Sequence, residues 1–239
     1  MTPPAIERVH AHLTEYGYAV TSDQEVGLPA GFSEAFSRNY FVDSIIRHDE
    51  GDWPIDRKRA RDVIRYWWHD DQLRLEEYDT ISITDRADIK GTRIHARVDM
   101  LADQQAKALV STFLKLIPPD RRQSDGTFGV NLFRTFTNVV TKPHRDNEEF
   151  IFVYVLDRVG DGAETYLYKP DSVLEDGSLL DGPLFKHQLQ PGELIVFDDK
   201  RFKHGATPLV DPPGGRARRD ALVCTVDYET TYLKKPVLV

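Results

Sequence analysis

Apolar side chains recur at helical spacing in two segments of the first half of the chain. Over residues 5–17 they fall three or four positions apart, and Gly17 is a typical helix stop. Residues 103–119 show the same spacing, with Asp103 in position to cap the start and two prolines at the end. The pattern therefore predicts one helix in each segment.

The rest of the first half carries less regular patterns. Residues 32–41 and 58–68 are predicted to be helical from their spacing of apolar positions. Three further segments are predicted to be strands, at residues 18–21, 78–85 and 92–100.

From about residue 127 the chain changes to short apolar runs separated by turn residues. Five of these runs are predicted to be strands, at residues 127–136, 150–157, 164–169, 193–199 and 219–229. The breaks between them carry Gly, Pro, Asp and Asn, and no crossover helix is evident, which argues against a parallel sheet. The pattern predicts a mainly β fold with flanking helices, an antiparallel barrel or jelly roll.

We expect one domain over residues 1–239, because no linker, repeat or low-complexity tract interrupts the chain. A helical buttress should occupy mostly residues 1–120, and the jelly-roll core mostly residues 75–235.

Charge and cysteine content narrow the possible functions. Lys and Arg number 31 against 39 Asp and Glu, a net charge of −8, which is unfavourable for a nucleic-acid partner. The basic run at 56–65 lies close to acidic stretches and is interpreted as a solvated helix face. Cys224 is the one cysteine, so no intramolecular disulfide can form, and its apolar neighbours indicate a buried small hydrophobe.

The location of the protein is inferred from what its sequence lacks. The first residues have no apolar core of the signal-peptide type, and no apolar run approaches membrane-spanning length. We therefore expect a cytoplasmic protein with a small-molecule substrate and without membrane or nucleic-acid partners.

His144 and Asp146 stand immediately before the apolar run at 150–157. Two residues apart in extended backbone, their side chains project to the same side and could bind one metal ion. His204 follows a later apolar strand, and an antiparallel fold can bring it to the same place. Two histidines and one carboxylate with open coordination positions are typical of non-haem Fe(II) oxygenases.

The strand at 219–229 begins with an arginine pair. Strand alternation places Arg219 on one face with small and polar residues, and Arg218 on the other face, which is mostly apolar. An arginine inside a barrel mouth needs an anionic partner, and a carboxylate pairs with its guanidinium through two hydrogen bonds. The alternative is that both arginines are surface charges of a basic loop.

Taken together, these residues resemble the 2-oxoglutarate-dependent Fe(II) dioxygenases, and most closely the branch of free-amino-acid hydroxylases that includes bacterial L-isoleucine hydroxylase. The matching segments are VNLFR (130–134), HRDN (144–147), GAETYLY (162–168), FDD with KHGATP (197–208) and RDALV (219–223). The resemblance covers roughly the C-terminal half and implies a double-stranded β-helix of the jelly-roll, cupin-like kind.

The resemblance implies a cofactor, a cosubstrate and a reaction. His144, Asp146 and His204 would hold Fe(II), 2-oxoglutarate would chelate the metal, and Arg219 would bind its distal carboxylate. O2 would then be used to hydroxylate a small molecule, a free L-amino acid or derivative, with release of succinate and CO2. Asn131 is expected either to contact the chelating end of 2-oxoglutarate or to have a purely structural role.

Candidate substrate contacts also follow from the resemblance. Arg134 would bind a substrate carboxylate and Glu148 or Glu149 an ammonium group; the alternative for each is a solvated charge on the barrel rim. Asn147 and Ala163 stand where the branch has glycine. Neither is a proposed ligand, so metal and cosubstrate binding should be retained, while the substrate pocket should become narrower.

Two other classes of protein fit the same residues less well. One is a cupin-like metal enzyme that does not use 2-oxoglutarate, such as an isomerase or a hydrolase, which would leave Arg219 without a function. The other is a non-catalytic β-barrel binding module in which the histidines have no chemical role. Within the oxygenase class, desaturation or ring formation is an alternative outcome to hydroxylation.

Overall fold

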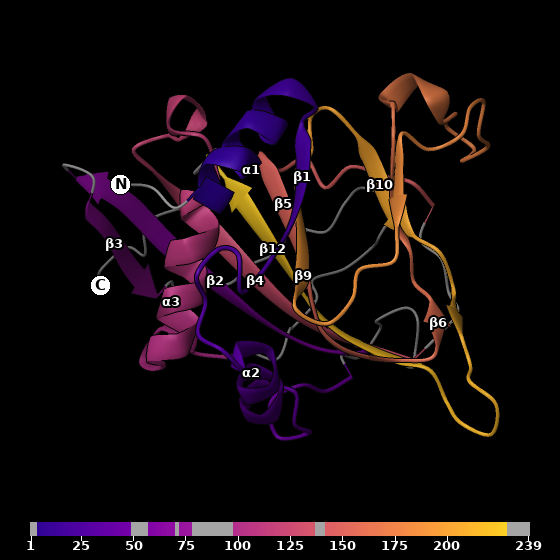
Figure 1. The fold of residues 1–239 in the computed structure, drawn as a ribbon, viewed down its shortest axis with the longest axis horizontal. Helices are drawn as coiled ribbons and strands as arrows, with labels where there is room; N and C mark the ends of the chain where they lie inside the picture. The colour runs from indigo at the N-terminus through magenta and orange to yellow at the C-terminus, as the bar shows by residue number, and fades with distance from the viewer. Residues whose placement is uncertain (1–3, 49–56, 70–71, 78–97, 137–141, 229–239) are drawn as a thin grey trace, which may run out of the picture.

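A computed structural model describes residues 4–48, 57–69, 72–77, 98–136 and 142–228 (Figure 1). Its α-helices are α1 (Pro4–Glu15), α2 (Phe32–Tyr40) and α3 (Gln104–Lys115), and short 3-10 turns span Met100–Ala102, Pro119–Arg121 and Pro170–Ser172. The strands are β1 (Tyr18–Ser22), β2 (Lys58–His69), β3 (Gln72–Glu77), β4 (Asp125–Thr135), β5 (Phe150–Val159), β6 (Asp161–Gly162), β7 (Thr165–Tyr168), β8 (Phe185–His187), β9 (Glu193–Asp198), β10 (Lys203–Ala206), β11 (Leu209–Val210) and β12 (Arg218–Asp227).

A seven-stranded sheet in the order β1-β9-β5-β12-β4-β2-β3 dominates the structure. A three-stranded sheet, β10-β7-β8, and the pair β11-β6 complete the described strands. Every one of these pairings is antiparallel. The predicted mainly β, antiparallel jelly-roll architecture with flanking helices is therefore confirmed.

One face of the large sheet is covered by the three helices, while β10 lies on the other side (Figure 1). The helix-covered face takes alternate residues of β5, among them Phe152 and Tyr154. Phe113 of α3 stacks on Phe152 with ring centroids 5.2 Å apart. Burial of these large aromatic side chains is the main force that holds the helices to the sheet.

The opposite, inner face of the large sheet forms a second core against the three-stranded sheet. Ile151 of β5 and Phe197 of β9 are fully buried there with Leu167 of β7, and Val223 of β12 packs against them. Successive residues of each strand therefore point alternately into the helix-covered core and into the inner core.

The three helices over residues 5–17, 32–41 and 103–119 are confirmed in their essentials. The Asp103 side chain accepts a hydrogen bond from the backbone N–H of Gln105 at 2.7 Å, as expected for a capping residue. The helix that it caps ends at Lys115, before the two prolines.

The helix predicted at 58–68 is wrong, because these residues form strand β2. Ala60, Asp62, Ile64 and Tyr66 are buried at every second position, and β2 pairs with β4 from Lys58 to Trp67. Arg59, Arg61 and Arg65 lie at the positions that alternate with these residues, so the three arginines share the opposite face of the strand. The basic run is therefore not a solvated helix face.

The five strands predicted in the second half are confirmed. The division between a helical N-terminal part and a later jelly roll is less sharp than expected, since β1, β2 and β3 also belong to the large sheet. The strand expected at 78–85 and most of that at 92–100 lie outside the described residues. The one-domain organisation stays a prediction.

The cysteine and the helices can be compared with two further expectations from the sequence. Cys224 is fully buried in the helix-covered core, as expected. Among the residues described here, no helix is long and apolar enough to cross a membrane.

β12 is bordered on both sides, by β4 and β5, and a bulge interrupts the second pairing. Asp220 lies opposite Asp157 and Ala221 opposite Val155, so Leu156 has no partner on β12. The bulge shifts the alternation of β5 by one residue, and Arg158 consequently lies opposite Arg219, on the same face.

Arg134 was expected to contact the substrate, but its guanidinium pairs with a carboxylate of the protein. Its Nε and Nη2 atoms donate to the two carboxylate oxygens of Asp220, each at 2.7 Å, and its guanidinium lies over the ring of Phe41. Asp220 is fully buried. We therefore assign Arg134 a structural role on the helix-covered face, and the prediction of a substrate carboxylate contact is not supported.

Replacing Arg134 with Met should lower the free energy of unfolding by about 3 kcal/mol, because Asp220 would lose the main partner of its buried charge. Urea denaturation followed by circular dichroism would measure the loss. The matched control is Arg218→Met, whose ion pair with Asp157 is partly exposed and should contribute less than about 1 kcal/mol. Equal losses in the two variants would contradict the structural assignment.

Candidate metal centre

His144, Asp146 and His204 lie together at one end of the two packed sheets. One potential ligand atom from each falls within 4.8 Å of the others. The Asp146 carboxylate is 3.6 Å from Nε2 of His144 and 3.4 Å from Nε2 of His204. Backbone hydrogen bonds in both directions, at 3.1 and 2.8 Å, pair His144 with His204 and fix the two rings side by side.

The protonation of the His144 ring follows from its hydrogen bond. Nδ1 lies 2.8 Å from the backbone oxygen of Lys142, which can only accept, so Nδ1 must carry the proton. Nε2 then keeps a lone pair directed toward Asp146. A histidine that binds a metal through Nε2 has this tautomer.

Asp199 is a fully buried carboxylate that connects the parts of this site. Its Oδ2 accepts hydrogen bonds from the backbone N–H groups of Asp146 and Glu148, at 3.0 and 3.1 Å. Its Oδ1 is 3.3 Å from Nδ1 of His204, without the alignment of a full hydrogen bond. One carboxylate thus holds the loop that bears Asp146 and also faces the second histidine.

The three side chains fit a divalent transition metal. Two imidazole nitrogens and a carboxylate oxygen on one side of an ion form the facial set typical of non-haem Fe(II). Ligand atoms that bind one ion at right angles lie about 3 Å apart, close to the observed separations. His144 and Asp146 are partly exposed while His204 is buried, so further coordination positions stay accessible on the side of the first two.

The two positions where the sequence departs from glycine keep a glycine-like backbone. Asn147 has φ 64° and Ala163 φ 50°, and no other non-glycine residue in the described ranges has positive φ. The side chain of Asn147 is exposed, and Ala163 packs with Leu209 and Ala217. The expected narrowing of the substrate pocket is therefore not supported at either position.

Arg218 and Arg219 have separate environments. Arg218 forms an ion pair with Asp157 and is partly exposed. Nη2 of Arg219 is buried and has no hydrogen-bond partner in the described structure. Burial, followed by the neighbouring charge of Arg158, lowers the pKa of Arg219 to about 10. An unmatched buried cation of this kind is costly and favours an anion beside it.

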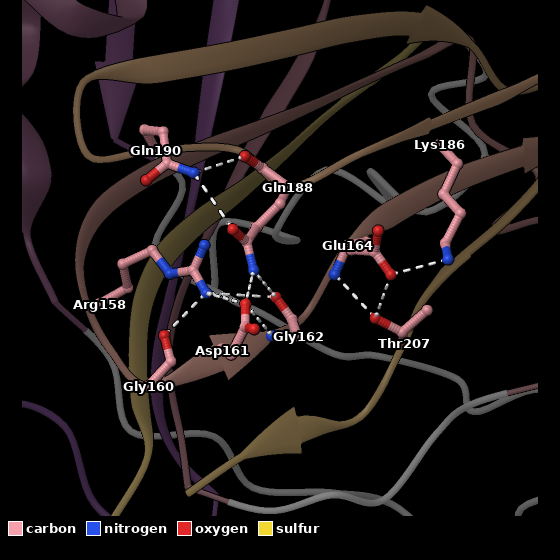
Figure 2. Close-up of polar contacts among 9 residues, drawn as sticks. All are labelled: Arg158, Gly160, Asp161, Gly162, Glu164, Lys186, Gln188, Gln190 and Thr207. Atoms are coloured by element: carbon pink, nitrogen blue, oxygen red, sulfur yellow. Dashed lines mark hydrogen bonds and ion pairs between the residues drawn. The ribbon is translucent and has the colours of Figure 1, made fainter. Parts of the chain in front are cut away.

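Arg158 is held rigidly at the same inner end of the sheet (Figure 2). Its Nη2 donates to the backbone oxygens of Gly160 and Gly162, at 2.9 and 3.3 Å, and lies 3.9 Å from Asp161. Gln188 in turn donates to Asp161 and to the Gly162 oxygen. Two guanidinium groups therefore occupy neighbouring positions on β5 and β12.

A second polar group in Figure 2 joins the small sheet to the following loop. Glu164 pairs with Lys186 at 2.8 Å, and the Glu164 backbone N–H donates to the Thr207 hydroxyl at 2.9 Å. Thr207 lies three residues beyond His204, so these contacts stabilise the chain that leaves the metal ligand.

The remaining predicted site residues divide between structural and inward positions. Asn131 donates from Nδ2 to the backbone oxygen of Val223 at 3.0 Å, which agrees with the structural alternative. Glu149 pairs with the exposed Lys200 and lies away from the ligands. Glu148 is partly buried beside Thr225, with its Oε2 atom inaccessible to solvent, and burial first, then repulsion from Asp227, raises its pKa to about 7.

Three inward residues were missed in the sequence: Asp199, Arg158 and Arg61. Asp199 could have been found from the two consecutive acids that end a strongly apolar strand, because a buried carboxylate needs specific partners. Arg61 was hidden by the helical interpretation of its segment. Arg158 faces inward only because of the bulge at Leu156, which no local pattern indicates.

Asp199→Asn should reduce metal affinity by roughly 10- to 100-fold, the usual effect of losing a partner of a metal ligand. The amide oxygen can keep the two loop hydrogen bonds, but the amide N–H groups would face the N–H of His204. Anaerobic calorimetric titration with Fe(II) measures the change.

The control is Asp198→Asn, since Asp198 is also buried but pairs with Arg121 at 2.6 Å. It should lower stability without changing metal affinity. Unchanged Fe(II) affinity in Asp199→Asn would refute the role assigned to Asp199.

Solved structures share this fold along nearly the full chain. A bsmA homolog from Methylobium petroleophilum PM1 has a TM-score of 0.72 at 18% identity, with 94% of each chain covered. IDO from Bacillus thuringiensis has a TM-score of 0.65 at 16% identity, covering 94% of this chain and 96% of its own. A Pseudomonas putida prolyl-4-hydroxylase reaches 0.55 at 15% identity, covering 94% and 100%. These likenesses concern the fold alone.

The sequence comparisons place the chain in a family. No curated protein matches it significantly. A family model described as 2OG-Fe dioxygenase matches residues 54–225, well over half of the chain, and spans the three candidate ligands and Arg219. Together with the fold, this match establishes an Fe(II)- and 2-oxoglutarate-dependent enzyme that uses O2. The chain belongs to the 2OG-Fe dioxygenase family.

Proposed function

We propose that this enzyme hydroxylates a small free amino acid or a close derivative, using Fe(II) held by His144, Asp146 and His204. The observation that carries the proposal is the convergence of these three ligand atoms at one end of an inner face that also contains the unmatched Arg219 guanidinium. Bound Fe(II) and 2-oxoglutarate supply O2 activation, coupled to the formation of succinate and CO2.

Arg219 is the residue that we propose for the distal carboxylate of 2-oxoglutarate. Its buried cation and the carboxylate would neutralise each other, and the planar guanidinium suits two parallel hydrogen bonds. Arg158 adds a second fixed positive charge beside it, since its own guanidinium is held by backbone oxygens. Arg218 is engaged with Asp157 and is the weaker candidate.

The apolar residues of the inner face would also keep water away from the metal site. Ile151, Phe197 and Leu167 are fully buried beside the ligands and exclude solvent from the space between the sheets. Ionic contacts to the cosubstrate are stronger in such a poorly solvated site than at the surface. His144, with its proton held on Nδ1, would keep Nε2 free for the metal.

An amino-acid substrate is supported by the motifs shared with the free-amino-acid hydroxylases and by the inward Glu148, which we propose for the ammonium group. The net charge of −8 argues against a nucleic-acid substrate. A cytoplasmic location is part of the proposal and is supported by the single, buried cysteine. The resemblance favours hydroxylation over desaturation. The mass of the product distinguishes the two outcomes.

Family membership argues against the two other classes considered from the sequence. A cupin-like isomerase or hydrolase would not use 2-oxoglutarate, and a non-catalytic module would not need a facial metal set.

The function is tested by loading the protein anaerobically with Fe(II), adding 2-oxoglutarate and O2, and screening the standard L-amino acids. At least one should stimulate succinate release and give a product that is one oxygen atom heavier by mass spectrometry. His144→Ala and Asp146→Ala should lose both metal and turnover. Iron-loaded protein that releases no succinate with any member of the panel would overturn the substrate class.

Arg219→Met should raise the KM for 2-oxoglutarate at least tenfold while iron content stays unchanged, because each charge-assisted hydrogen bond contributes roughly 1.5–3 kcal/mol. Succinate release at varied 2-oxoglutarate concentrations gives the KM. Arg218→Met is the matched control on the opposite face and should leave the KM near the wild-type value. The reverse result would assign the cosubstrate to Arg218.

A further inference from the structure

Arg61 is a charged side chain on the inner face of β2 to which no role has yet been assigned. It lies opposite Asn131 of β4, which lies opposite Val223 of β12. Opposed residues of antiparallel strands share a face, and Val223 packs in the inner core. Arg61 therefore points to the same side of the sheet as the inner core, not toward the helices.

The Arg61 side chain is largely buried, and no described residue forms an ion pair with its guanidinium. Its Nε is inaccessible to solvent and has no hydrogen-bond partner among the residues that the structure describes. Burial lowers the pKa of Arg61, and the charge of Glu148 acts in the opposite direction. An arginine stays charged under such conditions, so the cost of burial persists until an anion binds.

Space for this guanidinium is made by a glycine on the neighbouring strand. A Cβ atom at Gly129 would lie 2.7 Å from the Thr225 hydroxyl oxygen and 3.7 Å from Nη2 of Arg61. Any side chain here would displace Thr225 and crowd Arg61. Gly129 thus lets two polar groups approach the strand surface from either side.

Glu148 supplies a carboxylate on the same side. It stands two residues after Asp146, and its backbone N–H is held by Asp199. Its Oε2 is buried and, within the described residues, lacks a hydrogen-bond partner. Arg61 and Glu148 attract each other, yet no ion pair between them is formed. A cation and a carboxylate, each with unused hydrogen-bonding capacity, face a common region.

We propose that Arg61 binds the α-carboxylate of the substrate while Glu148 binds its α-ammonium group, so that the enzyme selects free, zwitterionic amino acids. This inference rests on the proposed function and deepens it. The two charges of an α-amino acid are adjacent and opposite, which suits a site with one fixed cation and one fixed anion. Arg61 takes the place of Arg134, whose guanidinium is occupied by Asp220.

The proposed selectivity for free amino acids can be measured in the wild-type enzyme, before any residue is substituted. Each amino acid that stimulates succinate release is compared with its carboxamide and its N-acetyl derivative, which lack the carboxylate charge and the ammonium charge respectively. The wild-type enzyme should prefer the free amino acid at least tenfold over both in kcat/KM. Equal use of acid and carboxamide would overturn the proposal.

Arg61→Gln should then remove the preference for the carboxylate specifically. The KM for the amino acid should rise at least tenfold, the acid and carboxamide should become similar substrates, and the KM for 2-oxoglutarate should not change. Arg65→Gln is the control, because Arg65 is on the same strand but exposed. A rise in the 2-oxoglutarate KM instead would assign Arg61 to the cosubstrate and refute the proposal.

Two further measurements keep the test decisive. Binding of the amino acid to Mn(II)- and 2-oxoglutarate-loaded protein, measured by thermal shift, reports affinity without turnover and should be lost in Arg61→Gln. Should that variant not fold, Arg61→Lys keeps the charge but loses the planar fork, so the KM for the amino acid should rise, and an unchanged KM in it refutes the proposal. Iron-loaded wild-type protein without succinate release from any amino acid would refute the proposed function itself; normal turnover with unchanged selectivity in Arg61→Gln would refute only the role of Arg61.

Discussion

The pairing of β12 with β4 on one side and β5 on the other fixes both environments of the molecule. Because side chains alternate along a strand, the position of one central strand decides which residues meet the helices and which meet the small sheet. Leu222 and Cys224 join the helix-covered core, while Ala221 and Val223 join the inner one. The ionic groups follow the same division, with Arg134 and Asp220 paired on the outer face and Arg219 on the inner.

Two arginines of the inner face, Arg219 and Arg61, each have a buried nitrogen atom without a hydrogen-bond partner among the described residues, while Arg158 lies 3.9 Å from Asp161. The chain as a whole is acidic, with a net charge of −8, yet Arg219, Arg158 and Arg61 lie on this face. Burial of unmatched positive charge is tolerated in a stable fold only when it is outweighed by apolar packing elsewhere. Such a surface binds small anions such as carboxylates, and the acidic exterior would repel polyanions of the nucleic-acid kind.

Much of this architecture could be predicted because local patterns decide it. The helices at 5–17 and 103–119, the five late strands and the pair His144 and Asp146 depend on neighbours in sequence. The strand β2 could not be recognised so easily, because Arg59 and Arg61 look solvent-exposed in any local window. The choice between Arg134 and Arg61 depends on which face of the sheet bears the metal ligands, and that is a property of long-range pairing.

The bulge at Leu156 decides which side chain of β5 lies beside Arg219. If Leu156 were instead paired regularly with Asp220, the residue opposite Arg219 in the inner register would be Asp157 with its carboxylate, and not Arg158 with its guanidinium. The change would exchange an attractive for a repulsive group next to Arg219's anion, although no residue touching that anion would have been substituted. One unpaired, apolar residue thus sets the sign of the electric potential at the end of the inner face.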